Sequence, residues 1–235
     1  MTGLTAEEWE VLLLSLKVAF WSVVGSLPVA AAAAYVLARR RFPGKTLFDA
    51  FVHLPLVLPP VVVGYFLLLV LGRRGPLGAF LEEHFGIVFA FRWTGAALAC
   101  AVMGFPLMVR AIRLSVEAID ERLEAAARTL GAGSARVLVT ITLPLALPGV
   151  ITGTLLSFAR SLGEFGATIT FVSNIPGETR TLPLAIYTYT QVPNGDFFAM
   201  RLSTIAIVVS LVALVVSELL ARRATAAAKG KDAGG

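Results

Sequence analysis

Five long windows without a single charged residue constrain the fold of this chain more than any other feature. The windows are apolar, and 57% of the 235 residues are hydrophobic, whereas soluble domains are about 45–50% apolar. A bilayer is therefore the expected solvent. In hydrocarbon the backbone must satisfy its own hydrogen bonds, and a helix does so within one segment. We expect an all-α polytopic membrane bundle of five transmembrane helices, over residues 18–38, 50–72, 93–109, 137–159 and 202–217.

Two further segments are apolar but are not clean spans. Segment 76–91 mixes Phe and Leu with two glutamates and a histidine, which is typical of a helix or loop lying in the membrane interface. Segment 166–197 is interrupted by Pro176, Pro183 and Pro193. Irregular backbone is tolerated at membrane depth where protein or water covers it, so we expect a lid or re-entrant segment. Six spans nevertheless remain possible.

The basic residues define an orientation. Alternation of the five spans puts 13 of the 20 Lys and Arg residues on one side, which the positive-inside rule makes cytoplasmic. The acidic N-terminus is then outside and the C-terminus inside. Residues 1–223 form one transmembrane domain, and 224–235 are expected to be a disordered cytoplasmic tail. Orientation explains the net charge of +5 better than nucleic-acid binding does. The 13 residues are Arg39, Arg40, Arg41, Lys45, Arg110, Arg113, Arg122, Arg128, Arg136, Arg222, Arg223, Lys229 and Lys231.

A charged, alanine-rich stretch lies between the third and fourth windows, in a loop of about residues 116–142. It reads ERLEAAARTLGAGSARVLVTITLP over residues 121–144. Alanine is the best helix former, and Glu124 and Arg128 have the favourable i, i+4 order. Gly131 suits the left-handed position that ends a helix. We expect a short helix over 120–130 whose alanine face a partner can approach closely.

The spacing within this loop resembles the cytoplasmic signature of ABC importer permeases. Ala126 and Ala127 are followed after three residues by Gly131 and after nine more by Ile-Thr-Leu-Pro. In that family the loop forms a coupling helix that seats in a groove of the ATP-hydrolysing subunit. The family's glutamate position is Ala125 here, and Glu124 is one residue early, so the role of Glu124 is open. The resemblance implies a type I ABC importer permease fold and a set of ATPase-coupling residues: Glu124, Ala126, Ala127, Gly131, Ile141, Leu143 and Pro144.

Two later stretches resemble the molybdate permease subunits within that family. They are SLGEFGATITF at 161–171 and GETRTLPLAIY at 177–187. Sulfate permeases share Gly-Glu-Phe-Gly-Ala but match the second stretch less well, and tungstate is chemically close to molybdate. The resemblance implies a homodimer with two ATPase subunits and an external binding protein, importing molybdate across the bacterial cytoplasmic membrane by alternating access. ATP and Mg would lie on the ATPase, with no cofactor and no catalysis on this chain.

The outer end of the fourth window carries the polar residues that suit a translocation path or gate. Arg160 and Glu164 are i, i+4, and a lone charge deep in a span costs about 2.5–3.5 kcal/mol, so they are expected to pair or face water. Hydroxyls can serve a tetrahedral oxyanion or join helices. A structural ion pair is the alternative. The path or gate residues are Ser161, Glu164, Thr168 and Thr170.

Other classes of membrane protein fit the sequence less well. An ion-coupled secondary transporter usually carries intramembrane acids and repeated halves, and only Glu164 approaches this pattern. A membrane enzyme would need a metal-ligand cluster or a nucleophile with its base. The single Cys100 lies in an apolar run, where it is expected to be a small core residue.

Overall fold

The computed structural model describes residues 4–232, with side chains for 4–216 and Leu219, and every regular element in this part is a helix. The elements are α1 (Ala6–Arg39), α2 (Lys45–Val57), α3 (Pro60–Leu71), α4 (Pro76–Phe85), α5 (Trp93–Glu117), α6 (Glu121–Thr129), α7 (Ser134–Val137), the π-helix η1 (Leu138–Thr142), α8 (Leu143–Leu162), α9 (Gly166–Val172), α10 (Leu182–Thr190) and α11 (Asp196–Asp232).

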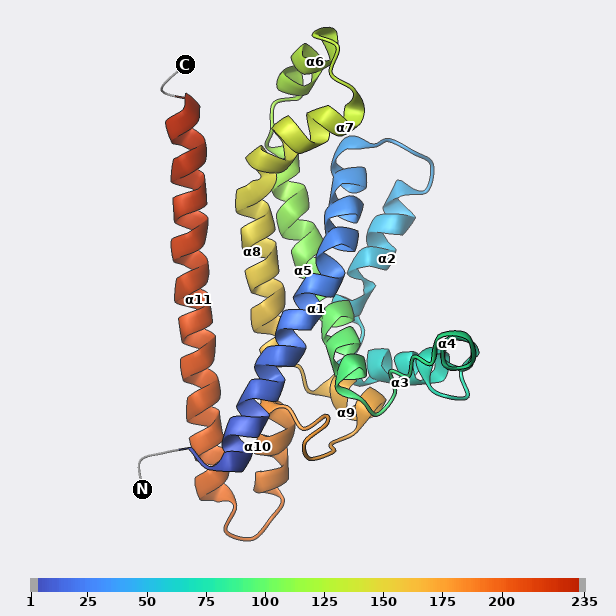
Figure 1. The fold of residues 1–235 in the computed structure, drawn as a ribbon, viewed down its shortest axis with the longest axis vertical. Coiled ribbons are helices and arrows are strands. Elements are labelled where there is room, and N and C mark those ends of the chain that lie inside the picture. Colours follow the sequence, from blue (N-terminus) through green and yellow to red (C-terminus); the bar gives the residue numbers. More distant parts are fainter. Residues whose placement is uncertain (1–3, 233–235) are drawn as a thin grey trace.

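The centre of the molecule is a bundle of α1, α5 and α8, with α11 along one side (Figure 1). Small residues bring the helices together. Ala30, Ala33 and Ala34 of α1 are buried against Met108 and its neighbours on α5. A Cβ added to Gly104 of α5 would collide with Ser157 of α8. Small residues allow such close backbone approach, which drives helix packing in membranes.

The second expected span is not a single straight helix. Residues 50–72 divide into α2 and α3, which are bent by 112° relative to each other at Leu58 and Pro59. Leu58 is extended, as a residue before proline prefers to be, and Pro59 and Pro60 supply no backbone N–H to continue α2. Within the described residues, four helices are long and apolar enough to cross a membrane, or five with the bent pair counted as one span.

The two ends of the bundle carry different structures. Figure 1 places α6 and α7 at the end where the chain terminates, and α9, α10 and the start of α1 at the opposite end. Segment 166–197 forms α9, a loop and α10 rather than a sixth span, in agreement with the sequence. The apolar stretch 76–91 contains α4, which projects sideways from the bundle with Phe80 and Phe85 exposed (Figure 1).

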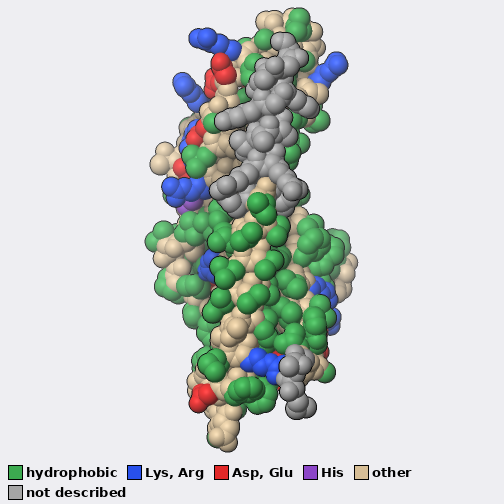
Figure 2. Space-filling model, turned by 90° about the vertical axis from the view of Figure 1, so that its left-hand side faces the viewer, with side chains coloured by type: hydrophobic (Ala, Val, Ile, Leu, Met, Phe, Trp, Pro, Cys, Tyr) green, Lys and Arg blue, Asp and Glu red, His purple; other side chains and the backbone are tan. Residues whose placement is uncertain are grey.

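The last helix differs from its expectation at its C-terminal end. α11 continues to Asp232, into the segment 224–235 for which the sequence predicts a disordered tail, and 233–235 lie outside the described residues. The alanines of this segment favour helix when it extends an existing one. Nearer the middle, α11 exposes Ile207, Leu211 and Val215. Figure 2 shows that hydrophobic side chains form a broad band across this side of the molecule. Such a surface suits lipid.

Candidate functional site

Helix α6 lies within the expected range 120–130, and both of its ends are capped as the sequence indicates. The Asp120 carboxylate accepts a hydrogen bond from the Arg122 amide at 2.9 Å, which caps the N-terminus. Gly131 follows the helix with φ of +86°. The Gly131 and Ala132 amides donate to the carbonyls of Arg128 and Ala127, both at 3.0 Å, in a Schellman motif. The sequence therefore specifies this short helix locally.

The surface of α6 is divided into two faces. Leu123, Ala126, Ala127 and Leu130 follow the i, i+3, i+4, i+7 spacing of one helix stripe. Leu123 is 49% exposed, Leu130 is 88% exposed, and Ala126 is exposed between them. We call these four residues the apolar face. An unpartnered apolar stripe on a short, charged helix is typical of a docking surface.

The opposite stripe of α6 is mostly polar, and Glu124 is the one residue on it that is buried against the bundle. This stripe carries Glu121, Glu124, Ala125 and Arg128 at the same spacing. These residues line a cavity of about 480 Å³ together with Tyr35, Arg39, Arg40, Arg122 and Ser134. The predicted coupling residues thus divide: the alanines face outward, whereas Glu124 faces inward.

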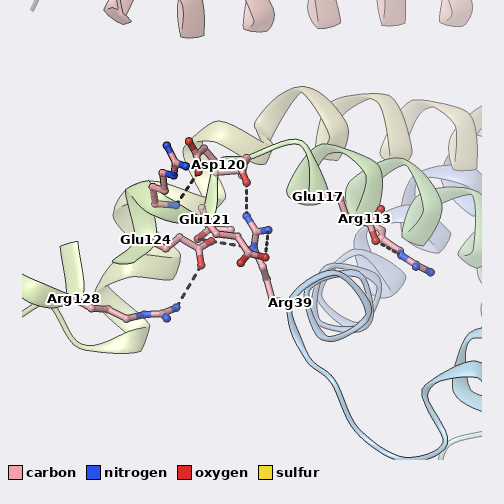
Figure 3. Close-up of polar contacts among 10 residues, drawn as sticks. Arg39, Arg113, Glu117, Asp120, Glu121, Glu124 and Arg128 are labelled. Carbon is pink, nitrogen blue, oxygen red and sulfur yellow. Dashed lines mark hydrogen bonds and ion pairs between the residues drawn. The ribbon is translucent and has the colours of Figure 1, made fainter. Parts of the chain in front are cut away.

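Glu124 holds α6 on the bundle (Figure 3). Its side chain is only 5% exposed, and Oε1 lies 3.3 Å from Nε of Arg39 at the end of α1. The same oxygen accepts a hydrogen bond from Oγ1 of Thr142 in η1 at 2.9 Å. Arg128 donates to Oε2 at 3.4 Å. Three separate elements therefore meet at one carboxylate, a role for Glu124 that its shifted position had left open.

Arg39 also takes part in this contact, and we call Glu124, Arg39 and Thr142 together the anchor. From the sequence, Arg39 was predicted only to indicate membrane orientation. Its guanidinium is 8% exposed, donates to the Ile119 carbonyl at 2.9 Å and lies 3.4 Å from the exposed Glu121 carboxylate. It thereby holds both the segment entering α6 and α6 itself. Neither Arg39 nor Thr142 has a sequence signal for this contact, because they lie 85 and 18 positions from Glu124.

The end of the loop leads directly into a span. Thr142 is buried in η1, Ile141 is half-buried, and Leu143 and Pro144 are exposed at the start of α8. Pro144 occupies the first turn, where its missing N–H costs nothing. α7, η1 and α8 form one apolar helical run from Ser134 to Leu162, and the Thr142 hydrogen bond links α6 directly to this run.

Comparison with known proteins identifies the family. Residues 26–226 match the family described as binding-protein-dependent transport system inner membrane component. This chain belongs to that family. The permease is 63% identical over 219 residues, 93% of its own length and 96% of the relative's, to the molybdenum transport system permease protein ModB of Escherichia coli K12. It is 58% identical to ModB of Haemophilus influenzae over 89% of this chain and 92% of that one. The sulfate permease protein CysW of Synechococcus elongatus is 38% identical, over 82% of this chain and 66% of that one.

Solved structures confirm the fold of the permease. A bacterial ABC transporter that imports alginate has a subunit that matches with a TM-score of 0.73 at 16% identity, over 94% of this chain and 80% of that one. The MetNI methionine ABC transporter matches with 0.67 at 15% identity, over 92% and 94%. The fold is therefore that of a type I ABC importer permease, as expected, and the role is transport rather than catalysis.

The predicted path residues of the permease lie inside the bundle. The Ser161 hydroxyl is 2.9 Å from that of Ser22. Glu164 is 1% exposed, pairs with Arg160 at 2.7 Å and accepts from the Ala167 amide at 2.8 Å, so it caps α9. Thr168 is buried, and its hydroxyl, like that of the half-buried Thr170, donates to a nearby carbonyl. The Ser161, Thr168 and Thr170 hydroxyls donate to backbone carbonyls, Oε2 of Glu164 has its ion pair but no hydrogen bond within the described residues, and none of the four residues lines the cavity beside α6. Their assignment to a path or gate stays a prediction.

The described residues of the permease also hold no cluster of three or more His, Cys, Asp or Glu side chains that could bind a metal ion. Cys100 is buried in the core between α1, α5 and α9.

Proposed function

We propose that this permease is the membrane-spanning subunit of an ATP-driven importer for molybdate. The observation that carries the proposal is the 63% identity to a molybdenum permease over 93% of the chain. The stretches at 161–171 and 177–187 agree with it, since they build the α9 and α10 end of the bundle.

Coupling to an ATPase is assigned to the apolar face of α6. Leu123, Ala126 and Leu130 project from the bundle with no large polar group among them, so a complementary groove on a soluble subunit can bury them. The assembly is a homodimer of this chain with two ATPase subunits, which hold ATP and Mg, and an external binding protein. The end of the molecule that carries α6 is cytoplasmic, and the N-terminal end, with α9 and α10, faces outward.

The anchor couples the docking of the ATPase on α6 to movement of α1 and α8. ATP binding closes the two ATPase subunits, and α6 moves with the groove in which it sits. Because Glu124 joins α6 to Arg39 and Thr142, α1 and α8 follow. Shifting a two-state equilibrium from 1:99 to 99:1 requires about 5.5 kcal/mol of differential binding. Two docked helices and nucleotide binding can supply this amount, and the bundle alternates between inward-open and outward-open states.

Tungstate and sulfate are the alternative substrates, and the 38% identity to a sulfate permease favours testing both. The chain is co-expressed with its ATPase, reconstituted in vesicles with the binding protein, and assayed for radiolabelled molybdate uptake against each competitor. We expect ATP-dependent, vanadate-sensitive uptake that tungstate reduces more than sulfate does. Uptake that survives ATP depletion and collapses with a proton or sodium gradient would instead indicate a secondary transporter. Stronger competition by sulfate than by tungstate would reassign the substrate.

A further inference from the structure

A second cavity, separate from the one beside α6, lies in a groove between α5 and α8. Its volume is about 420 Å³. The α5 wall is the stripe Leu107, Arg110, Ala111 and Leu114, again at i, i+3, i+4 and i+7 spacing. The α8 wall consists of Pro148, Gly149, Thr152 and Leu156. Only Arg110 and Thr152 bring polar side chains to this groove.

Among the described side chains, none engages Arg110 or Thr152 through a polar contact. Within residues 4–216, the Arg110 guanidinium and the Thr152 hydroxyl have no hydrogen bond or ion pair, and Arg110 is exposed. Arg113, one turn further along α5, shows the contrast. It lies 2.9 Å from Asp49 and 2.7 Å from Glu117, so its charge is neutralised. The Arg110 charge is therefore available to a ligand.

Arg110 is the first charged residue after the expected span 93–109, on the inner part of α5. It lies about two turns before α5 ends at Glu117, roughly 10 Å at 1.5 Å per residue. An arginine inside a span costs about 2.5–3.5 kcal/mol on insertion scales unless it faces water or protein. Charged residues within spans accordingly face a bundle interior or a watery cavity. The groove lies in the half of the bundle nearest α6, where this charge favours water or protein over lipid.

We infer that this groove lines the inner half of the substrate path, and that Arg110 is the cation that an oxyanion meets there. The inference rests on the proposed function and names a contact for its substrate. A guanidinium donates two parallel hydrogen bonds to a tetrahedral oxyanion, and the Thr152 hydroxyl offers a third from the facing helix. Apolar walls leave the anion few other partners. One cation therefore attracts the dianion into the groove but does not bind it so tightly that its release becomes slow.

The first test uses the whole complex in vesicles and measures both uptake and ATP hydrolysis. Arg110→Gln is expected to reduce molybdate uptake per ATP by roughly tenfold or more, because it removes the charge-assisted hydrogen bonds of the guanidinium. Binding-protein-stimulated ATP hydrolysis is expected to persist, and Arg110→Lys to retain most uptake. Arg41→Gln is the matched control, since Arg41 is exposed beyond α1 and lines neither cavity.

Three results separate the possible failures. Unchanged uptake per ATP in Arg110→Gln would overturn the inference. Loss of uptake together with dissociation of the permease dimer would also overturn it, since the groove would then be an interface between two copies of the chain. If the wild-type complex imports no oxyanion, the proposed function fails, and the groove is judged by the labelling test alone.

The second test asks whether the groove is wet. In a Cys100→Ala background, Arg110→Cys and Leu211→Cys are treated with a membrane-impermeant cationic thiol reagent from the α6 side. We expect rapid reaction at position 110 and none at 211, which lies exposed on the apolar surface of α11. A position 110 that stays unreactive both with and without ATP would refute an aqueous path, even if Arg110→Gln fails to fold.

Discussion

Nε of Arg39 lies 3.3 Å from Oε1 of Glu124 and joins the end of α1 to α6 across 85 positions of the chain. Both side chains are almost fully buried, at 8% and 5% exposed. This pair fixes α6 to the membrane bundle.

Removing the carboxylate from this pair should release α6. Glu124→Ala leaves the Arg39 charge buried without its main partner, which costs about 3–5 kcal/mol in buried pairs. We expect much faster hydrogen exchange of the α6 amides and loss of coupled uptake. Glu121→Ala is the control, since the Glu121 side chain is 80% exposed and its ion pair is worth about 0–1 kcal/mol. Equal exchange rates in the two variants would contradict the anchor.

The two faces of α6 should respond differently to the same substitution. Ala126→Glu places a charge on the apolar face, where desolvation on docking is costly, so ATPase binding should fall by at least tenfold. Ala125→Glu places the same group on the polar face, in the cavity lined by Arg39, Arg122 and Arg128, where it is tolerated. Affinity of the purified ATPase for each variant is the measurement. Normal ATPase binding by Ala126→Glu would show that the apolar face is not the docking surface.

The end of α6 depends on the conformational freedom of one glycine. Gly131 has φ of +86°, and an added Cβ would meet no atom within 4 Å. The cost of Gly131→Ala is therefore conformational and amounts to about 1–2 kcal/mol. Asn tolerates this conformation better, so Gly131→Asn should fall between Ala and wild type. Thermal unfolding and ATPase affinity of the three proteins give the ranking, and an unaffected Gly131→Ala protein would contradict it.

The contact between α5 and α8 should be sensitive to a single methyl group. Cβ atoms at Gly104 and Gly149 would collide with Ser157 and Ser115 of the facing helix, so Gly104→Ala and Gly149→Ala should each cost about 1–3 kcal/mol. Gly25 of α1 has nothing within 4 Å of the same position, and Gly25→Ala should be neutral or stabilising. Melting temperatures in detergent test this order. Equal effects at Gly25 and Gly104 would show that the close approach is not needed.

Much of this arrangement could be predicted because the signals are local. Uncharged windows identify the spans, and the alanines with Gly131 identify α6, since periodicity and capping depend on neighbouring residues. The bend between α2 and α3 escaped prediction because residues 50–72 are uniformly uncharged, so composition does not mark a change of direction. Pro59 and Pro60 were the available signal.

The remaining contacts are set by tertiary packing, which a single sequence does not reveal. Arg39 and Glu124 meet only because α1 and α6 end at the same level of the bundle. Ser161 and Thr168 were assigned to the path because hydroxyls on apolar helices suit either an anion or a neighbouring helix. Both side chains are buried, and the choice between the two roles stays a prediction. Arg110 was counted as a topology signal, and its groove is visible only once α5 and α8 are placed side by side.

The glycines at the α5–α8 contact limit how this protein can move. An added Cβ would meet Ser157 at Gly104, Ser115 at Gly149 and the Met108 backbone at Gly153, so the two helices pack too closely to slide or separate without overlap or a void. We therefore expect α5 and α8 to move together as one rigid body. Gating motions are then expected where this helix pair contacts the neighbouring helices, and the hinge is expected outside the pair.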